Sequence, residues 1–211
     1  MDKSVKALQA FMGIVYAGCF YVPLDIEMPT SRIELILENA QPAAIITDKK
    51  GSVIAENLQF DGEILSAETL FENEINDAAL QTIRAKQIDT DPIYIVFTSG
   101  STGVPKGVVA CHRSVIDYIE NLSAELGFSE ESIFANQTPL FFDAPLKELM
   151  PVIKLGATAY LVPKSLFSFP MRLCDFLNEH RINTVCWVVS ALTMISSMGV
   201  LEKNPPKKKK K

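Results

Sequence analysis

Short apolar runs alternate with segments of helical periodicity along most of the sequence, and this alternation limits the possible folds more than any other feature. Apolar residues spaced three or four positions apart predict helices at 4–17, 31–39, 113–126 and 173–181. Continuous apolar runs predict a buried strand at 43–47 and further strands at 93–97, 158–162 and 184–189. Strands that alternate with helices favour an α/β protein, a layered α/β/α fold with a largely parallel sheet.

Two segments do not follow this alternation. Residues 51–90 are acidic and weakly periodic, which predicts a variable surface segment. Within the alternating part, Ser31 and Glu34 form a capping box that predicts the start of the second helix. The segment 204–211 combines two prolines with five lysines, which is typical of a solvated, disordered tail, and contact with anionic lipid or nucleic acid is the alternative. We therefore expect one domain over 1–203 and a disordered Pro/Lys tail at 204–211.

Charge and cysteine usage exclude several classes of function. The five terminal lysines are part of only 20 basic residues, so the rest of the chain carries 15 basic against 25 acidic residues. Such an acidic body predicts no nucleic-acid partner, and the absence of a run of about 20 apolar residues predicts no membrane span. The four cysteines are scattered without paired spacing, which predicts no metal site and a reduced, cytoplasmic location.

A glycine-rich segment, Thr98 to Gly107, follows the strand expected at 93–97. Its three glycines allow backbone N–H groups to point at an anion, its hydroxyl side chains add donors, and Lys106 adds a positive charge. This composition suits a polyphosphate, with a solvated turn as the alternative. A Walker A loop requires Ser or Thr after its lysine, and Gly107 stands there instead, so that type of loop is excluded.

The stretch YIVFTSGSTGVPKG at 94–107 resembles the signature loop of the adenylate-forming (AMP-binding) superfamily, which includes acyl-CoA synthetases, luciferases and nonribosomal peptide synthetase adenylation domains. The stretch AGCFYVPLD at 17–25 is similar to a second family pattern, which explains these residues better than a lipoprotein signal peptide does. The stretch FDAPLKE at 142–148 resembles the "FDxSVxE" segment of amino-acid-activating members. The resemblance implies an incomplete N-terminal adenylation domain, a partial large domain of such an enzyme.

The resemblance also implies roles for individual residues. The loop would close over the β- and γ-phosphates of ATP through Thr98, Ser99, Gly100, Ser101, Thr102, Gly103, Lys106 and Gly107. Asp143 would pair with the α-ammonium group of an amino acid in a buried setting, with capping of the following helix as its alternative role. Side-chain selectivity positions are matched by Ala144, Lys147 and Trp187. His112 is expected at the start of a helix, and no residue is assigned as catalytic.

The function that the resemblance implies is ATP-dependent activation of a carboxylic acid, preferably an amino acid, as an acyl-adenylate. The acyl group would then pass to the phosphopantetheine thiol of a carrier protein. Motifs resembling those that hold adenine, ribose and Mg²⁺, and the catalytic lysine, do not occur, so the chain is expected to be an inactive or incomplete fragment. Alternatives are an acyl-CoA synthetase fragment, a non-catalytic remnant, or a subunit of a split enzyme with a complementing chain.

Overall fold

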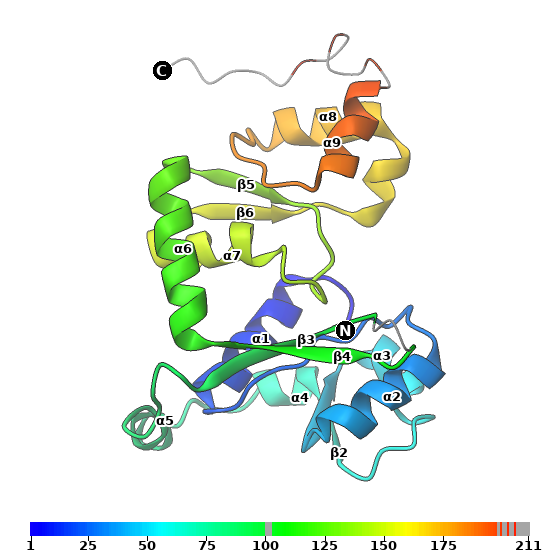
Figure 1. Ribbon diagram of the computed structural model, residues 1–211, viewed down its shortest axis with the longest axis vertical. Coiled ribbons are helices and arrows are strands. Elements are labelled where there is room, and N and C mark those ends of the chain that lie inside the picture. Colours follow the sequence, from blue (N-terminus) through cyan, green and yellow to red (C-terminus); the bar gives the residue numbers. More distant parts are fainter. Residues whose placement is uncertain (100–102, 198, 200–201, 203–204, 206–211) are drawn as a thin grey trace. The chain divides into compact units, whose positions relative to one another are not determined.

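The computed structural model describes residues 1–99 and 103–197, together with 199, 202 and 205. The chain forms two compact units, Met1–Val115 and Ile116–Lys211 (Figure 1). Helix α6 (His112–Leu126) begins in the first unit and continues in the second. The single domain expected over 1–203 stays a prediction, and of the expected tail at 204–211 only Pro205 belongs to the described residues.

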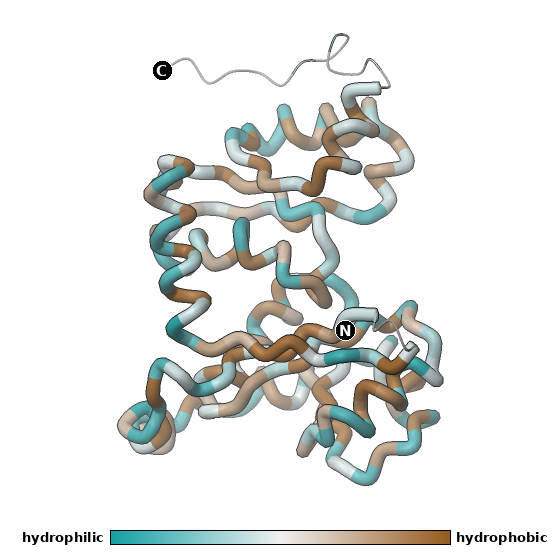
Figure 2. The backbone as a smooth tube through the Cα atoms, viewed as in Figure 1, coloured by the Kyte–Doolittle hydropathy of each residue, from teal (hydrophilic) through white to brown (hydrophobic). Residues whose placement is uncertain are grey.

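The first unit contains one parallel and one antiparallel pair of strands. Strand β1 (Ala44–Thr47) runs parallel to β2 (Glu63–Ser66), and β3 (Pro92–Thr98) runs antiparallel to β4 (Lys106–Cys111). The helices of this unit are α1 (Val5–Tyr16), α2 (Thr30–Ala40), α3 (Lys49–Ala55), α4 (Ala67–Phe71) and α5 (Asp77–Arg84). Apolar residues dominate the tube along β3 and β4 (Figure 2).

Tyr21 joins helix α1 to strand β3. Its backbone N–H donates to the carbonyl of Ile93 at 3.2 Å, and its own carbonyl accepts from Ile95 at 2.9 Å. Its ring stacks on Phe11 of α1 with centroids 4.3 Å apart, and burial, followed by the neighbouring Tyr94, raises the pKa of its hydroxyl. The extended backbone after α1 therefore adds a one-residue parallel bridge beside Tyr94.

Two predictions about the first unit are wrong. Helix α2 begins at Thr30 with Pro29 as its N-cap and no side-chain cap, so Ser31 already lies inside the helix and no capping box forms. The segment 51–90 is not wholly peripheral, because β2 pairs with β1 and Ala67 is fully buried. Helix α5, further along the same segment, has no buried residue and matches the surface prediction.

The second unit is built around a parallel pair of strands, β5 (Ile133–Asn136) and β6 (Thr158–Leu161). Its helices after α6 are α7 (Leu146–Leu155), the 3-10 helix η1 (Lys164–Ser168), α8 (Pro170–Glu179) and α9 (Val189–Ser197). Helix α8 begins before the expected residue 173 because Pro170, with its fixed φ, suits the first helical position. The core consists of Ala135, Val162, Leu173, Cys174, Leu177, Trp187, Ala191 and Ile195.

The strand predicted at 184–189 is reduced to a single bridge. Thr184 pairs with Phe134 of β5, but the next backbone N–H groups do not continue the ladder. The N–H of Cys186 donates instead to Glu148 Oε1 at 3.2 Å, and α9 begins at Val189. The strand prediction for 184–189 is therefore wrong, and within this run only Trp187 is buried, while Val185, Val188 and Val189 are exposed.

The predicted α/β class is confirmed. Two of the three strand pairs among the described residues are parallel, and the antiparallel pair is the hairpin β3–β4. The strands expected at 43–47, 93–97 and 158–162 and the helices expected at 4–17 and 113–126 are all present. Across the part of the chain that the structure describes, every helix is too short or too polar to cross a bilayer.

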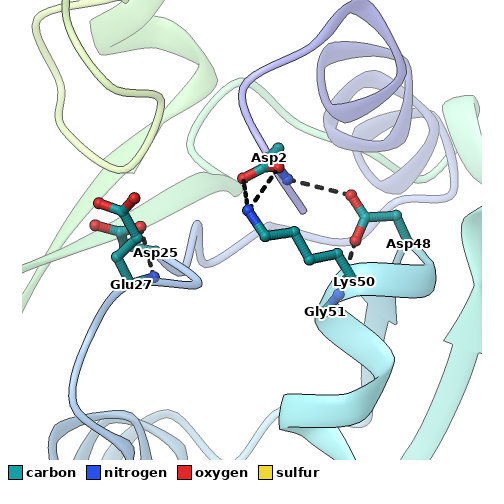
Figure 3. Close-up of polar contacts among 6 residues, drawn as sticks. All are labelled: Asp2, Asp25, Glu27, Asp48, Lys50 and Gly51. Carbon is teal, nitrogen blue, oxygen red and sulfur yellow. Dashed lines mark hydrogen bonds and ion pairs between the residues drawn. The ribbon is translucent and has the colours of Figure 1, made fainter. Parts of the chain in front are cut away.

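Asp48 provides a first testable prediction. Its Oδ1 accepts from the N–H of Gly51 at 2.9 Å, which caps α3, and its Oδ2 accepts from the N–H of Asp2 at 3.2 Å (Figure 3). Burial raises the pKa of this carboxyl, but these hydrogen bonds outweigh burial and lower it overall. The pKa is thus lower in the folded state, so the stabilisation is present above the unfolded value of about 3.9 and is lost as pH falls through the folded value.

Asp48→Ala is expected to lower the free energy of unfolding by about 1 kcal/mol at neutral pH. Urea denaturation measured from pH 7 down to pH 2 should show the difference from wild type shrinking below about pH 4. The exposed Asp61→Ala serves as the control. A difference that stays constant over the whole pH range would contradict the capping role.

Gly107 provides a second prediction. It pairs across the strands with Phe97, and a Cβ atom at this position would lie 2.8 Å from Ile95 Cγ2 and 3.1 Å from the Phe97 ring. Gly107→Ala is therefore expected to lower the free energy of unfolding by about 1–2 kcal/mol through overpacking. The exposed neighbour Val108→Ala is the matched control in the same denaturation assay, and equal values for the two variants would refute the crowding.

Candidate functional site

The glycine-rich segment connects the two strands of the β3–β4 hairpin. Thr98 pairs with Lys106 at the end of the ladder, and Ser99, Gly103 and Val104 are exposed. The prediction of an exposed loop at a strand end is thus confirmed for these residues. The predicted phosphate-binding residues Gly100, Ser101 and Thr102 lie outside the described residues.

Thr98 and Lys106, which pair at the end of the hairpin, carry a hydroxyl and an ammonium group. Thr98 Oγ1 donates to the carbonyl of Lys106 at 3.4 Å, while the Lys106 side chain is exposed. Gly103 has φ +81°, a conformation that residues with a Cβ atom rarely adopt, and Pro105 is fully buried. An exposed cation beside such a turn suits a phosphate group, and this chemistry fits ATP.

The base of the hairpin is held by groups that were not predicted. The Arg113 guanidinium donates to both carboxylate oxygens of Asp89 at 2.7 Å, and these bonds lower the pKa of Asp89. His112 begins α6, as expected, and its backbone N–H donates to the Asp91 carbonyl at 3.1 Å. The pKa of the Cys111 thiol is lowered, first by the backbone N–H of Ser114. Loop 89–91 and the start of α6 are thereby held together.

The predicted acid-binding residues Asp143 and Ala144 lie in the turn between β5 and α7. The Asp143 carbonyl accepts from the N–H of Leu146 at 3.0 Å, and its carboxylate is exposed rather than buried as expected. The alternative role as a helix cap is wrong for the side chain, because Pro145 is the N-cap of α7 and makes no side-chain cap. The charge of Asp143 contributes, after burial, to raising the pKa of Tyr118. Its carboxylate is thus accessible to a cationic group.

Lys147 and Trp187 differ in their surroundings. Lys147 is half-buried in the first turn of α7, and its N–H donates to the Ala144 carbonyl at 3.2 Å. Trp187 lies in the hydrophobic core, where its indole N–H donates to the Ala135 carbonyl at 2.6 Å and its ring packs edge-on against Phe167. A selectivity role for Trp187 stays a prediction, and its observed contacts are those of a core residue.

The sequence analysis assigned no role to Glu148, the last residue of the segment 142–148. It is 1% exposed, its Oε2 accepts from Asn136 Nδ2 at 2.8 Å, and its Oε1 accepts from the N–H of Cys186 at 3.2 Å. The pKa of the Cys186 thiol is raised, first by burial and then by the charge of Glu148, while the charge of Lys147 acts in the opposite direction. The available signal was a glutamate flanked by Leu146 and Leu149 on the apolar face of the helix.

The sequence was compared as a whole with those of known proteins. The profile of a family described as "AMP-binding enzyme" matches residues 1–211. The L-proline–[L-prolyl-carrier protein] ligase of Pseudomonas fluorescens is 32% identical over 94% of this chain and 41% of its own length. The D-alanine–D-alanyl carrier protein ligase of Staphylococcus aureus is 33% identical over 84% of this chain and 34% of its own length. The chain therefore spans less than half of each of these relatives.

A solved structure supports the same assignment. The crystal structure of a four-domain nonribosomal peptide synthetase bound to AMP and glycine has a TM-score of 0.77 and 26% identity, over 93% of this chain and 14% of that chain. The matched family covers the entire sequence, including the hairpin loop and the Asp143 turn. The chain thus belongs to the AMP-binding enzyme family, the adenylate-forming ligases.

Proposed function

We propose that this chain is part of a ligase that activates an amino acid with ATP. The observation that carries the proposal is the accessible carboxylate of Asp143, placed by a turn at the start of α7 in a member of the AMP-binding family. An exposed carboxylate offers a partner to an ammonium group, which amino acids have and simple fatty acids lack.

The proposed reaction is an in-line displacement. A carboxylate oxygen of the amino acid forms a bond to the α-phosphorus of ATP, and the bond from that phosphorus to the bridging oxygen breaks. Pyrophosphate leaves with the electron pair, and aminoacyl-AMP remains. Because the reaction needs no covalent group from the enzyme, the protein contributes positioning and charge stabilisation.

The β3–β4 hairpin would hold the phosphates in this scheme. Lys106 would stabilise negative charge on the departing pyrophosphate, and Gly103 and Gly107 would allow the backbone to approach it. Mg²⁺ accompanies the nucleotide in this proposal and would neutralise phosphate charge, but no residue of this chain is assigned to it. The remaining predicted residues, Thr98, Ser99, Gly100, Ser101 and Thr102, would supply hydroxyl and N–H donors.

Asp143 would bind the α-ammonium group, and Ala144, Lys147 and Trp187 would influence which side chain is accepted. The names of the two carrier-protein ligases above, for proline and for D-alanine, support an amino acid as the substrate class. They also support a carrier protein as the acceptor, whose phosphopantetheine thiol would attack the acyl carbon and release AMP. The identity of the amino acid stays open.

Substitution of Asp143 tests the substrate class. The enzyme is assembled by exchanging the matching segment of the proline–carrier protein ligase for this chain, and amino acids are assayed beside their des-amino analogues by pyrophosphate exchange. Asp143→Ala is expected to lower kcat/KM for amino acids by about 10- to 150-fold, since a hydrogen bond to a charged group is worth about 1.5–3 kcal/mol. Lys106→Ala should slow all substrates alike, because in this scheme Lys106 would contact only phosphate.

Two exposed residues serve as matched controls for this experiment, Asp175→Ala on α8 and Lys86→Ala after α5. Equal losses for amino acids and des-amino acids in Asp143→Ala would make Asp143 a structural residue. That result would favour acyl-CoA synthesis as the function.

The isolated chain gives a further prediction. We expect the 211 residues alone to catalyse no amino-acid-dependent pyrophosphate exchange, because no residues resemble the motifs for adenine, ribose and the catalytic lysine. The purified chain is assayed with the 20 amino acids, and Lys106→Ala is assayed in parallel to reveal contaminating enzymes. Exchange that exceeds background and disappears in the variant would contradict this prediction and exclude a non-catalytic remnant.

A further inference from the structure

A buried carboxylate connects three segments of the second unit. Glu148, in the first turn of α7, accepts from the side chain of Asn136 at the end of β5 and from the backbone of Cys186. The partners lie 12 and 38 residues away in the sequence. Asn136 is fully buried and Glu148 nearly so, and a buried charge is tolerated only when hydrogen bonds replace its hydration.

A fourth hydrogen-bonding residue closes these contacts into a ring. Trp187 follows Cys186 directly, and its indole N–H donates to Ala135, the residue before Asn136. Asn136 is therefore linked to Cys186 through the Glu148 carboxylate, and Ala135 is linked directly to Trp187 through the indole. We call this arrangement the Glu148 ring, formed by Ala135, Asn136, Glu148, Cys186 and Trp187.

The predicted acid-binding residues are attached to this ring by short turns. The N–H of Glu148 donates to the Pro145 carbonyl at 3.1 Å, that of Lys147 to Ala144 at 3.2 Å, and that of Leu146 to Asp143 at 3.0 Å. Successive i to i+3 hydrogen bonds leave the turn little freedom. The place of Glu148 therefore determines the place of the Asp143 backbone, from which the carboxylate extends, relative to Trp187.

We propose that Glu148 is a positioning residue for acid selection, holding Asp143 at a fixed place relative to the Trp187 segment through the Glu148 ring. The inference rests on the proposed function, because it assigns Asp143 to the substrate ammonium. An apolar residue of similar size would fill the same space but could not accept from Asn136 and Cys186 together. The directional bonds, rather than the volume, carry the role.

Exchanging the carboxylate and the amide between Glu148 and Asn136 provides the variants that test the proposal most directly. Glu148→Gln and Glu148→Leu remove the carboxylate, and Asn136→Asp places a second carboxylate beside the first. The double variant Asn136→Asp/Glu148→Gln restores one carboxylate and one amide, because the Gln carbonyl accepts from Cys186 and its amide donates to the new Asp. Exposed Glu130→Gln is the control for the loss of a surface charge.

The first readout is hydrogen exchange in the 211-residue chain. The sequence has a single tryptophan, so the indole N–H of Trp187 gives one identifiable NMR signal. In Glu148→Leu, protection of this proton and of the Cys186 amide should fall by about tenfold or more, while the β1–β2 amides of the first unit keep theirs. The double variant should recover the protection, and failure to recover it would overturn the proposal.

The second readout is ligand preference in the assembled enzyme described above, measured by pyrophosphate exchange with amino acids and their des-amino analogues. A positioning role lowers the preference for the ammonium-bearing ligand by about tenfold in Glu148→Leu, whereas the double variant Asn136→Asp/Glu148→Gln keeps it. A purely structural role lowers binding of both ligand classes equally, and that result would overturn the proposal. If the assembled wild-type enzyme shows no preference, the proposed function fails, and hydrogen exchange still decides whether Glu148 holds the ring.

Discussion

The burial of one carboxylate, that of Glu148, is the constraint on which the arrangement of the second unit depends. A carboxylate inside a protein loses its hydration and needs hydrogen-bond donors, and Asn136 and Cys186 provide them from two distant segments. Helix α7 can therefore pack only where its first turn reaches the end of β5. The segment after Thr184 does not continue the strand ladder, because the N–H of Cys186 donates to the carboxylate instead.

The first unit depends on a different kind of contact. Backbone pairing of β3 and β4 fixes the two ends of the glycine-rich loop, and the pair Asp89–Arg113 connects the approach to β3 with the start of α6. At Gly107, the side chains of Ile95 and Phe97 on the neighbouring strand leave no room for a Cβ atom. A rigid support of this kind allows a short loop to be both exposed and well placed, which ligand-binding loops commonly require.

The sequence was most informative where a local pattern determined the result. Strand β3 and helix α6 both follow from residues adjacent in the chain. Strand β5 was missed because it is four residues long and ends at Asn136, whose side chain bonds to Glu148 on helix α7. The run at 184–189 was misread because no local pattern reveals that Glu148 accepts from Cys186. The exposure of Asp143 also escaped prediction, since apolar neighbours such as Phe142 are themselves exposed in this turn.

The bridge between Tyr21 and Tyr94 has a consequence for how the first unit folds. Helix α1 and Tyr21 are synthesised before their partners on β3, and the bond from Gln87 to the Val15 carbonyl spans 72 residues. Contacts between residues so distant in sequence form slowly, because the intervening chain must be ordered before they contribute. During synthesis α1 and Tyr21 therefore have no sheet to pack against until β3 has left the ribosome, and their apolar side chains stay accessible to chaperones throughout that interval.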